Sequence, residues 1–261
     1  MSYFVWNTSP TLIGFGPIEI RWYGLFFALA FLLGQGYMGW RLRKDGGKSG
    51  LSEVENFLDV LLLYIVLGTL LGARLAHCLI YEPDYYFLRP WEVLMVWRGG
   101  LASHGGVAGF LCSLLLFNRR KSIPFLPLLD RLAIPAAFGG TLVRLGNFFN
   151  SEIVGRPTDV PWAVVFLRVD TLARHPVQLY ESMSYLCIAT LLAVADCKGA
   201  SEKPGRLTAV FLMSVFGARM IWELFKSEQT SWMGGFFLSI GQILSLPLVM
   251  IGFYLFFFRK S

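Results

Sequence analysis

The residues most able to do chemistry lie in one short stretch, Arg144 to Glu152, at the end of an apolar segment. The stretch also contains the amides of Asn147 and Asn150. An ionisable group within a membrane segment is costly, and such groups usually have a function. A guanidinium fork matches phosphate oxygens, and amides can hydrogen-bond to hydroxyl groups. The stretch therefore predicts a binding site for a ligand that carries a phosphate.

Other polar residues interrupt apolar segments elsewhere. His104 follows Ser103 and precedes two glycines, and an imidazole titrates near neutrality, so His104 is the predicted proton acceptor. Arg219 and Glu223 are spaced i to i+4, so they can bind a ligand or neutralise one another. Arg74 can bind a ligand or extend to the membrane surface.

The composition predicts an all-α integral membrane protein. Hydrophobic residues make up 55% of the 261 positions and charged residues 15%, which is too apolar for a soluble domain. Without a long polar block, residues 1–261 are expected to form a single transmembrane catalytic domain. The net charge of +6 does not indicate nucleic acid, because the basic residues cluster in short loops. The four cysteines lack CxxC spacing, so neither a disulfide nor a metal or other cofactor is expected.

Seven apolar segments are close to the roughly 20 residues that a helix needs to cross a bilayer. They are Trp22–Trp40, Phe57–Tyr81, Leu101–Phe117, Ile123–Phe149, Val177–Ala195, Leu207–Phe225 and Phe236–Phe258.

The basic residues orient these segments. Loops on one side hold 12 Lys and Arg in 31 residues: 41–52, 118–122, 196–206 and the tail 259–261. Those on the other side hold 7 in 81 residues: 1–21, 82–100, 145–175 and 226–235. The basic side is cytoplasmic by the positive-inside rule, so the N-terminus is predicted outside and the C-terminus inside. Aromatic residues fill one outer loop and predict an interfacial segment: Tyr85, Tyr86, Phe87, Trp91 and Trp97.

This orientation places polar groups from five segments in the outer third of the membrane: Tyr23, Arg74, His104, Arg144 and Arg219 with Glu223. A lipid or anion transporter, the main alternative, requires groups near the midplane. An intramembrane serine protease using Ser103 and His104 is disfavoured, because adjacent helical residues point about 100° apart. The pattern favours an amphiphilic substrate held at the outer leaflet.

Six ordered segments carry a family resemblance. They are Trp22-Tyr23-Gly24, Gly99 to Gly106, Arg144 to Arg156, His175 to Glu181, Arg219 with Glu223, and Gly241 to Ser245. Together they resemble the bacterial prolipoprotein diacylglyceryl transferases over nearly the whole chain. The resemblance implies seven spans in the bacterial inner membrane, with the active site facing the outer leaflet.

The resemblance also implies a reaction. Phosphatidylglycerol would give its diacylglyceryl group to the lipobox cysteine of a prolipoprotein signal peptide, forming a thioether and releasing glycerol 1-phosphate. Arg144 would bind the phosphate, and Asn147, Glu152 and Gly155 would complete its pocket. Four further positions match important family residues: Tyr23, His104, Arg219 and Glu223. Arg74 is a further candidate for substrate binding.

Catalysis is assigned to three of these residues. His104 is expected to accept the thiol proton while Arg144 and Arg219 hold the leaving phosphate. A carboxylate or the lipid phosphate is the alternative base. The sequence departs from the family pattern at two positions, where Val215 replaces a common tyrosine and Lys226 a common arginine. The outer stretch between Gly155 and His175 is short, so any extramembrane head should be small.

Overall fold

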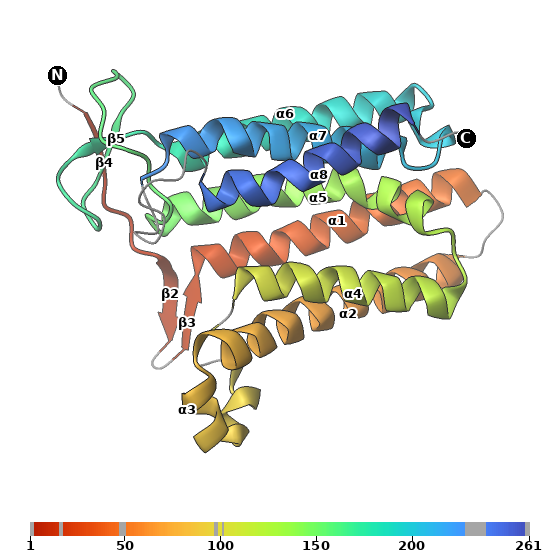
Figure 1. Cartoon of the computed structure of the whole chain (residues 1–261), viewed down its shortest axis with the longest axis horizontal. Coiled ribbons are helices and arrows are strands. Elements are labelled where there is room, and N and C mark those ends of the chain that lie inside the picture. Colours follow the sequence, from red (N-terminus) through yellow and green to blue (C-terminus); the bar gives the residue numbers. More distant parts are fainter. Residues whose placement is uncertain are drawn as a thin grey trace. The chain divides into compact units, whose positions relative to one another are not determined.

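The computed structural model describes residues 3–15, 18–46, 51–96, 99–100, 102–227 and 239–258. Within these ranges the chain is mostly helical, and a long helix overlaps each of the seven predicted apolar segments (Figure 1): α1 Trp22–Gly46, α2 Leu51–Ala76, α4 Ser103–Lys121, α5 Phe125–Phe149, α6 Val177–Cys197, α7 Arg206–Trp222 and α8 Ile240–Phe257. The predicted start at Leu101 and residues 236–238 of the last segment lie outside the described residues.

Several helices are apolar enough to cross a membrane. Among the described residues, three stretches combine sufficient length and hydropathy: Glu53–Tyr81, Phe125–Phe149 and Val177–Cys197. The stretch Gly241–Phe257 is apolar but shorter. The structure therefore supports a helical membrane protein.

The chain forms two compact units. Unit 1 comprises Met1–Met38 and Leu126–Ser261, and unit 2 comprises Gly39–Phe125. The helical core of unit 1 joins the inner faces of α5, α6 and α7 through eight buried residues: Ala133, Ile134, Ala137, Tyr185, Ile188, Ala189, Leu192 and Leu207. Small residues on α5 allow the close approach of α6, because a Cβ at Gly140 would lie 3.1 Å from the Tyr185 ring.

Asp130 fixes the start of α7 against α5. Its buried carboxylate accepts hydrogen bonds from the Gly205 amide, the Thr208 amide at 2.8 Å and the Thr208 hydroxyl at 2.7 Å. These bonds satisfy amides at a helix N-terminus that otherwise lack partners. Asp130 therefore has a structural role at the end of α7 that is opposite to Arg219.

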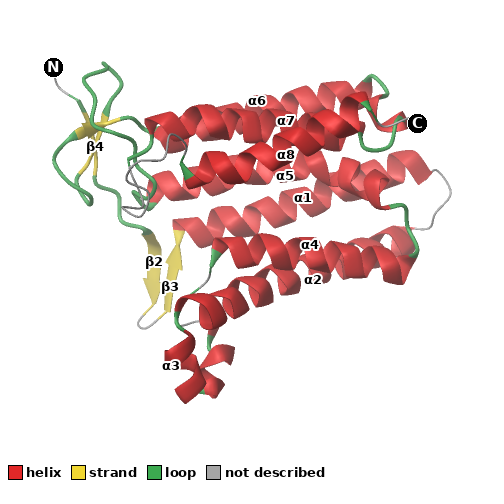
Figure 2. Cartoon of the chain, viewed as in Figure 1, coloured by secondary structure: helices red, strands yellow, loops and turns green. Residues whose placement is uncertain are grey.

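Short strands extend unit 1 beyond its helices (Figure 2). Strand β1 (Phe4–Trp6) pairs in parallel with β4 (Val164–Phe166), which pairs with β5 (Ala173–Arg174). A second pair, β2 (Thr11–Phe15) and β3 (Ile18–Arg21), is antiparallel. The all-α prediction omitted these strands. Residues of β1 and β4 cover the end of α5, where a second core is formed by Phe148, Val154, Val164 and Phe166.

Unit 2 is built on α2 and α4, which approach through glycines. A Cβ on Gly68 or Gly72 would lie closer than 3.0 Å to the backbone of α4, and one on Gly105 or Gly109 equally close to α2. The Gly68-xxx-Gly72 spacing therefore allows α2 to pack closely against α4. After α2 come η1 (His77–Tyr81), α3 (Pro83–Leu88) and η2 (Pro90–Leu94), a segment rich in exposed apolar side chains.

Candidate functional site

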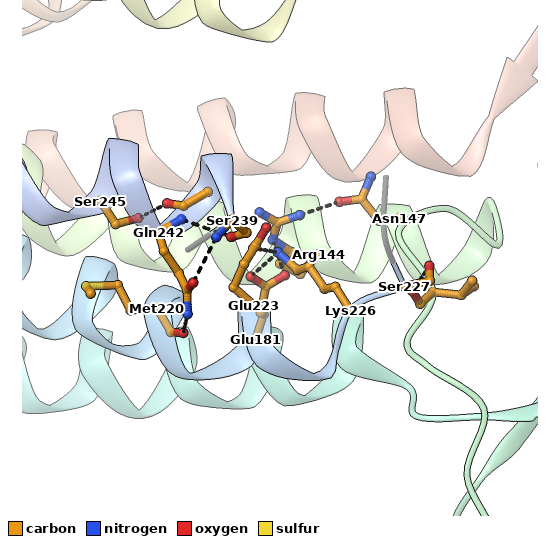
Figure 3. A network of polar contacts seen from close by, with 12 residues as sticks. Arg144, Asn147, Glu181, Met220, Glu223, Lys226, Ser227, Ser239, Gln242 and Ser245 are labelled. Carbon is orange, nitrogen blue, oxygen red and sulfur yellow. Dashed lines mark hydrogen bonds and ion pairs between the residues drawn. The ribbon is translucent and has the colours of Figure 1, made fainter. Parts of the chain in front are cut away.

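Polar side chains gather at one end of the helices of unit 1. Arg144 lies near the C-terminal end of α5, and Glu181 lies in the first turns of α6. Glu223 begins η5 (Glu223–Phe225), which follows α7 directly, and Lys226 comes next. Gln242 opens α8 (Figure 3). Four helix ends therefore bring together residues that are far apart in the sequence.

Glu181 is at the centre of this network. Its side chain is 0% exposed, and Oε2 lies 2.9 Å from Arg144 Nε, an ion-pair distance without an aligned hydrogen bond. Its other oxygen, Oε1, accepts a hydrogen bond from Lys226 Nζ at 3.0 Å. Lys226 Nζ also donates to Glu223 Oε2 at 2.8 Å. A buried carboxylate is tolerated only with partners, and Arg144 and Lys226 are two cations that Glu181 contacts.

Arg144 also begins a series of side-chain contacts along the stretch Arg144 to Glu152, the predicted phosphate-binding site. Its Nη1 donates to Asn147 Oδ1 at 3.2 Å, and Asn147 Nδ2 donates to Glu152 Oε2 at 3.0 Å. Asn150 Nδ2 donates to the other Glu152 oxygen at 3.2 Å. The structure thus brings together the four polar residues that the sequence placed in one site. Arg144 is therefore oriented by the neutral amide of Asn147 as well as by its ion pair with Glu181.

Gly155 lies where two backbone segments meet. Its amide donates to the His175 carbonyl at 3.0 Å, and its own carbonyl accepts from Arg174 Nη1 at 3.0 Å. A Cβ here would lie closer than 3.0 Å to the His175 carbonyl and to the Val177 side chain. The glycine is therefore required for backbone approach. The His175 amide in turn donates to the Arg156 carbonyl at 3.1 Å.

Charged residues stabilise the connection between α5 and α6, residues 150–176. Arg174 hydrogen-bonds to Asp170 and holds the pKa of that carboxyl below its usual value. Partial burial lowers the pKa of His175, so its imidazole is neutral at physiological pH. The loop also reaches the Lys226 region, because Arg156 Nε donates to the Lys226 carbonyl at 3.0 Å.

Two tyrosines lie beside the network. The Tyr23 phenol, at the start of α1, is within electrostatic reach of Glu152 and Arg144. A Cβ at Gly146 would lie 2.9 Å from the Tyr23 ring, so this glycine lets α5 approach Tyr23. Tyr185 of α6 is within electrostatic reach of Glu181, Arg144 and Arg219. The structure therefore places Tyr23 near Arg144, and it places Arg144 and Arg219 each within electrostatic reach of Tyr185.

The start of α8 also contacts the network. Ser239 caps the helix by accepting from the Gln242 amide at 3.2 Å, and Gln242 Nε2 donates to the Met220 carbonyl at 3.1 Å. A Cβ at Gly241 would lie closer than 3.0 Å to the Glu223 carboxylate. The segment Gly241 to Ser245, noted for its family resemblance, therefore packs against Glu223.

Two predicted residues belong to unit 2. The backbone of His104 lies in the first turn of α4, but the side chains of Ser103 and His104 are outside the described part of the structure. Arg74 is 3% exposed, so it does not extend to the surface, which was the alternative to ligand binding.

The contacts of Arg74 favour a positioning role. Nε donates to the Val93 carbonyl at 2.9 Å, Nη1 to Gly99 at 2.5 Å and Nη2 to Glu92 at 2.6 Å. All three nitrogens thus bind backbone carbonyls of the segment that leads to α4. Substrate binding by Arg74 remains a prediction. The hydrogen bonds of its guanidinium hold the segment that leads to α4.

Arg74→Ala is expected to lower the free energy of unfolding by about 3 kcal/mol or more, since a hydrogen bond to a charged group contributes roughly 1.5–3 kcal/mol. Arg74→Lys should not restore stability, because an ammonium cannot reproduce the fork. Thermal unfolding and protease cleavage within residues 83–100 would measure this, with exposed Arg89→Ala as the control. Unchanged stability together with lost activity would instead favour contact with substrate.

Two important partners were missed from the sequence. Glu181 lies in a segment noted for its resemblance, but no role was assigned to it. Lys226 was noted only as a departure from the family. One feature of the sequence could have indicated the pairing: Glu181 and Lys226, an acid and a base, lie at the ends of neighbouring apolar segments. Among the described residues, no group of three or more His, Cys, Asp or Glu side chains could hold a metal ion.

Comparison with known proteins finds a matching family model and similar sequences. The family model described as prolipoprotein diacylglyceryl transferase matches residues 10–258. A phosphatidylglycerol–prolipoprotein diacylglyceryl transferase of Tolumonas auensis is 50% identical over 248 residues, covering 95% of this chain and 94% of the relative. The enzyme of the same name from Chloroherpeton thalassium is 47% identical over 258 residues, covering 98% and 94%. That from Porphyromonas gingivalis is 36% identical, covering 97% and 94%.

Proposed function

Since the chain belongs to the prolipoprotein diacylglyceryl transferase family, we propose that it transfers the diacylglyceryl group of phosphatidylglycerol to the lipobox cysteine of prolipoproteins. The cysteine sulfur forms a bond to the glyceryl carbon of the lipid, and the bond between that carbon and the phosphate oxygen breaks. A thioether and glycerol 1-phosphate result. The thiol proton leaves to a base, so the atoms and charges balance.

The observation that carries this proposal is the network around Arg144. Arg144 combines 11% side-chain exposure with an ion-pair partner, Glu181, that it shares with Lys226, and both Arg144 and Arg219 are within electrostatic reach of Tyr185. A cationic group in a largely water-excluded place favours an anionic headgroup more strongly than one in water. Glu181 and Asn147 fix its orientation before the lipid binds. This pre-organisation suits the phosphate of a phospholipid.

The cationic residues also serve the chemical step. As the carbon–oxygen bond breaks, negative charge grows on the leaving phosphate, and Arg144 and Arg219 stabilise it. The nucleophile arrives with the peptide, so the enzyme's own cysteines are not needed. A free thiol has a pKa near 8.5, so a base increases the thiolate fraction. We assign this base role to His104, with a carboxylate or the lipid phosphate as the alternative.

We place the enzyme in the bacterial inner membrane as one catalytic domain of seven spans. In this orientation the N-terminus is outside, the C-terminus is cytoplasmic and the Arg144 network faces the outer leaflet. Two observations support this: the dense Lys and Arg content of loops on one side, and the gathering of polar residues at one end of the unit 1 helices. The outer leaflet is where an exported signal peptide would meet its lipid donor.

The base assignment makes a specific prediction. His104→Gln is expected to lower kcat by about 100-fold or more, the usual contribution of a general base, with little change in KM for phosphatidylglycerol. Steady-state transfer rates between pH 5.5 and pH 8.5 would measure this. Full activity of His104→Gln across that range would assign the proton to another group.

The function itself is tested with purified protein, phosphatidylglycerol and a synthetic lipobox peptide. The expected result is a peptide mass increase of one diacylglyceryl unit. A peptide with serine in place of the lipobox cysteine is the control and should remain unmodified. Movement of labelled phosphatidylglycerol across sealed vesicles without covalent change would favour a transporter instead.

A further inference from the structure

Lys226 is the cation shared by two carboxylates of the network. Its side chain is 6% exposed, and Nζ lies 3.0 Å from Glu181 Oε1 and 2.8 Å from Glu223 Oε2 (Figure 3). Glu181 is also the ion-pair partner of Arg144, through its second oxygen. Lys226 and Arg144 therefore share Glu181, and the charge on one affects how strongly the other is held.

The backbone of Lys226 is as firmly placed as its side chain. Lys226 bridges Gly155 in an antiparallel arrangement, and its carbonyl accepts from Arg156 Nε at 3.0 Å. The adjacent Ser227 amide donates to the Val154 carbonyl at 3.2 Å. Lys226 thus joins the end of α7 to the loop after the Arg144 stretch. Because the backbone of Lys226 is already fixed, little further conformational entropy is lost when its side chain binds the carboxylates of Glu181 and Glu223.

Loss of this ammonium would change the charge around Arg144. Glu181 would keep Arg144 as its ion-pair partner, whereas Glu223 would lose the ion pair that it forms with Lys226. A guanidinium held by excess negative charge has less attraction for a phosphate, and the same negative charge repels the phosphate directly.

We propose that Lys226 is a positioning residue, which neutralises Glu181 and Glu223 so that Arg144 keeps its positive charge available for the donor phosphate. This inference rests on the proposed function and adds a residue to it. Lys226 does not touch the reacting atoms. It acts through Glu181, so its removal should weaken phosphatidylglycerol binding more than it slows the chemical step.

Each neighbouring element contributes one charged group to this balance: Glu181 of α6, Arg144 of α5 and Glu223 of η5. Removal of the Lys226 ammonium leaves one cation for two carboxylates in this set. That change in charge is what the following experiment measures.

The test compares Lys226→Met with Lys226→Arg in the peptide transfer assay. Lys226→Met is expected to raise KM for phosphatidylglycerol by about tenfold at pH 8, the equivalent of one charged hydrogen bond, with a smaller change in kcat. Lys226→Arg keeps the charge and should stay within about threefold of wild type. The exposed Lys198→Met is the matched control and should change neither parameter.

A double-mutant cycle keeps the test decisive if Lys226→Met folds poorly. In the Glu223→Gln background one carboxylate is already neutral, so Lys226→Met should cost less there than in the wild type. Equal costs in both backgrounds, or an unchanged KM for phosphatidylglycerol, would overturn the proposal. A wild-type protein that modifies no peptide would instead overturn the proposed function, so the two failures are distinguishable.

Discussion

Arg144→Ala is expected to abolish diacylglyceryl transfer, with a rate at least about 1,000-fold below wild type, because it removes both phosphate binding and stabilisation of the leaving group. It also leaves Glu181 with one cation, Lys226, instead of two. Arg144→Lys should recover only part of the loss, since an ammonium lacks the paired donors that match two phosphate oxygens.

This variant is measured for transfer rate and for folding in the same preparation. The exposed Arg168→Ala is the matched control, because it removes one guanidinium from outside the network and should retain full activity. Membrane insertion and a single elution peak would show that Arg144→Ala remains folded. Wild-type turnover by folded Arg144→Ala would remove the phosphate-binding role from the account.

Gly155→Ala should have the second largest effect. A methyl group there would overlap the His175 carbonyl and the Val177 side chain, and such overpacking typically costs about 1–3 kcal/mol even in adaptable cores. Since backbone atoms form part of the contact, the loop must move away from α6 and from Lys226. We expect a lower unfolding temperature and a transfer rate reduced by about 100-fold, through misplaced binding groups.

Gly36→Ala is the control for this prediction, since a Cβ on Gly36 of α1 has no neighbour within 4 Å. It should be neutral or stabilising by up to about 1 kcal/mol. Thermal unfolding and transfer rates would be measured for both variants. Unchanged stability of Gly155→Ala with lost transfer would indicate that the glycine admits the ligand, as the family resemblance implies. Unchanged stability and activity would contradict both explanations.

The helices could be predicted from the sequence because the membrane requires long apolar stretches. Each predicted stretch overlaps a long helix. The short strands were not predicted. Strand β1 has only three residues, and its partner β4 lies more than 150 positions away, so no local pattern indicates the pairing. Long-range pairing of this kind is set by the tertiary fold.

The candidate site was likewise predicted only in part: contacts between residues close in the sequence were foreseen, and contacts between different helices were not. Arg144, Asn147 and Glu152 are close in sequence, so their association was predicted and their side chains are in contact. The pairing of Glu181 with Arg144 and Lys226 was not predicted, because it depends on how α5, α6 and α7 pack. One alternative was also resolved by tertiary structure: Glu223 forms its ion pair with Lys226 and not, among the described side chains, with Arg219.

The most direct test follows both products of one reaction with wild type and Arg144→Ala. Mass spectrometry would quantify the modified lipobox peptide, and phosphorus NMR would quantify the released glycerol phosphate. The account predicts one glycerol phosphate for each modified peptide with wild type, and neither product with Arg144→Ala. Peptide modification by Arg144→Ala at the wild-type rate, or modification by wild type without release of glycerol phosphate, would contradict it.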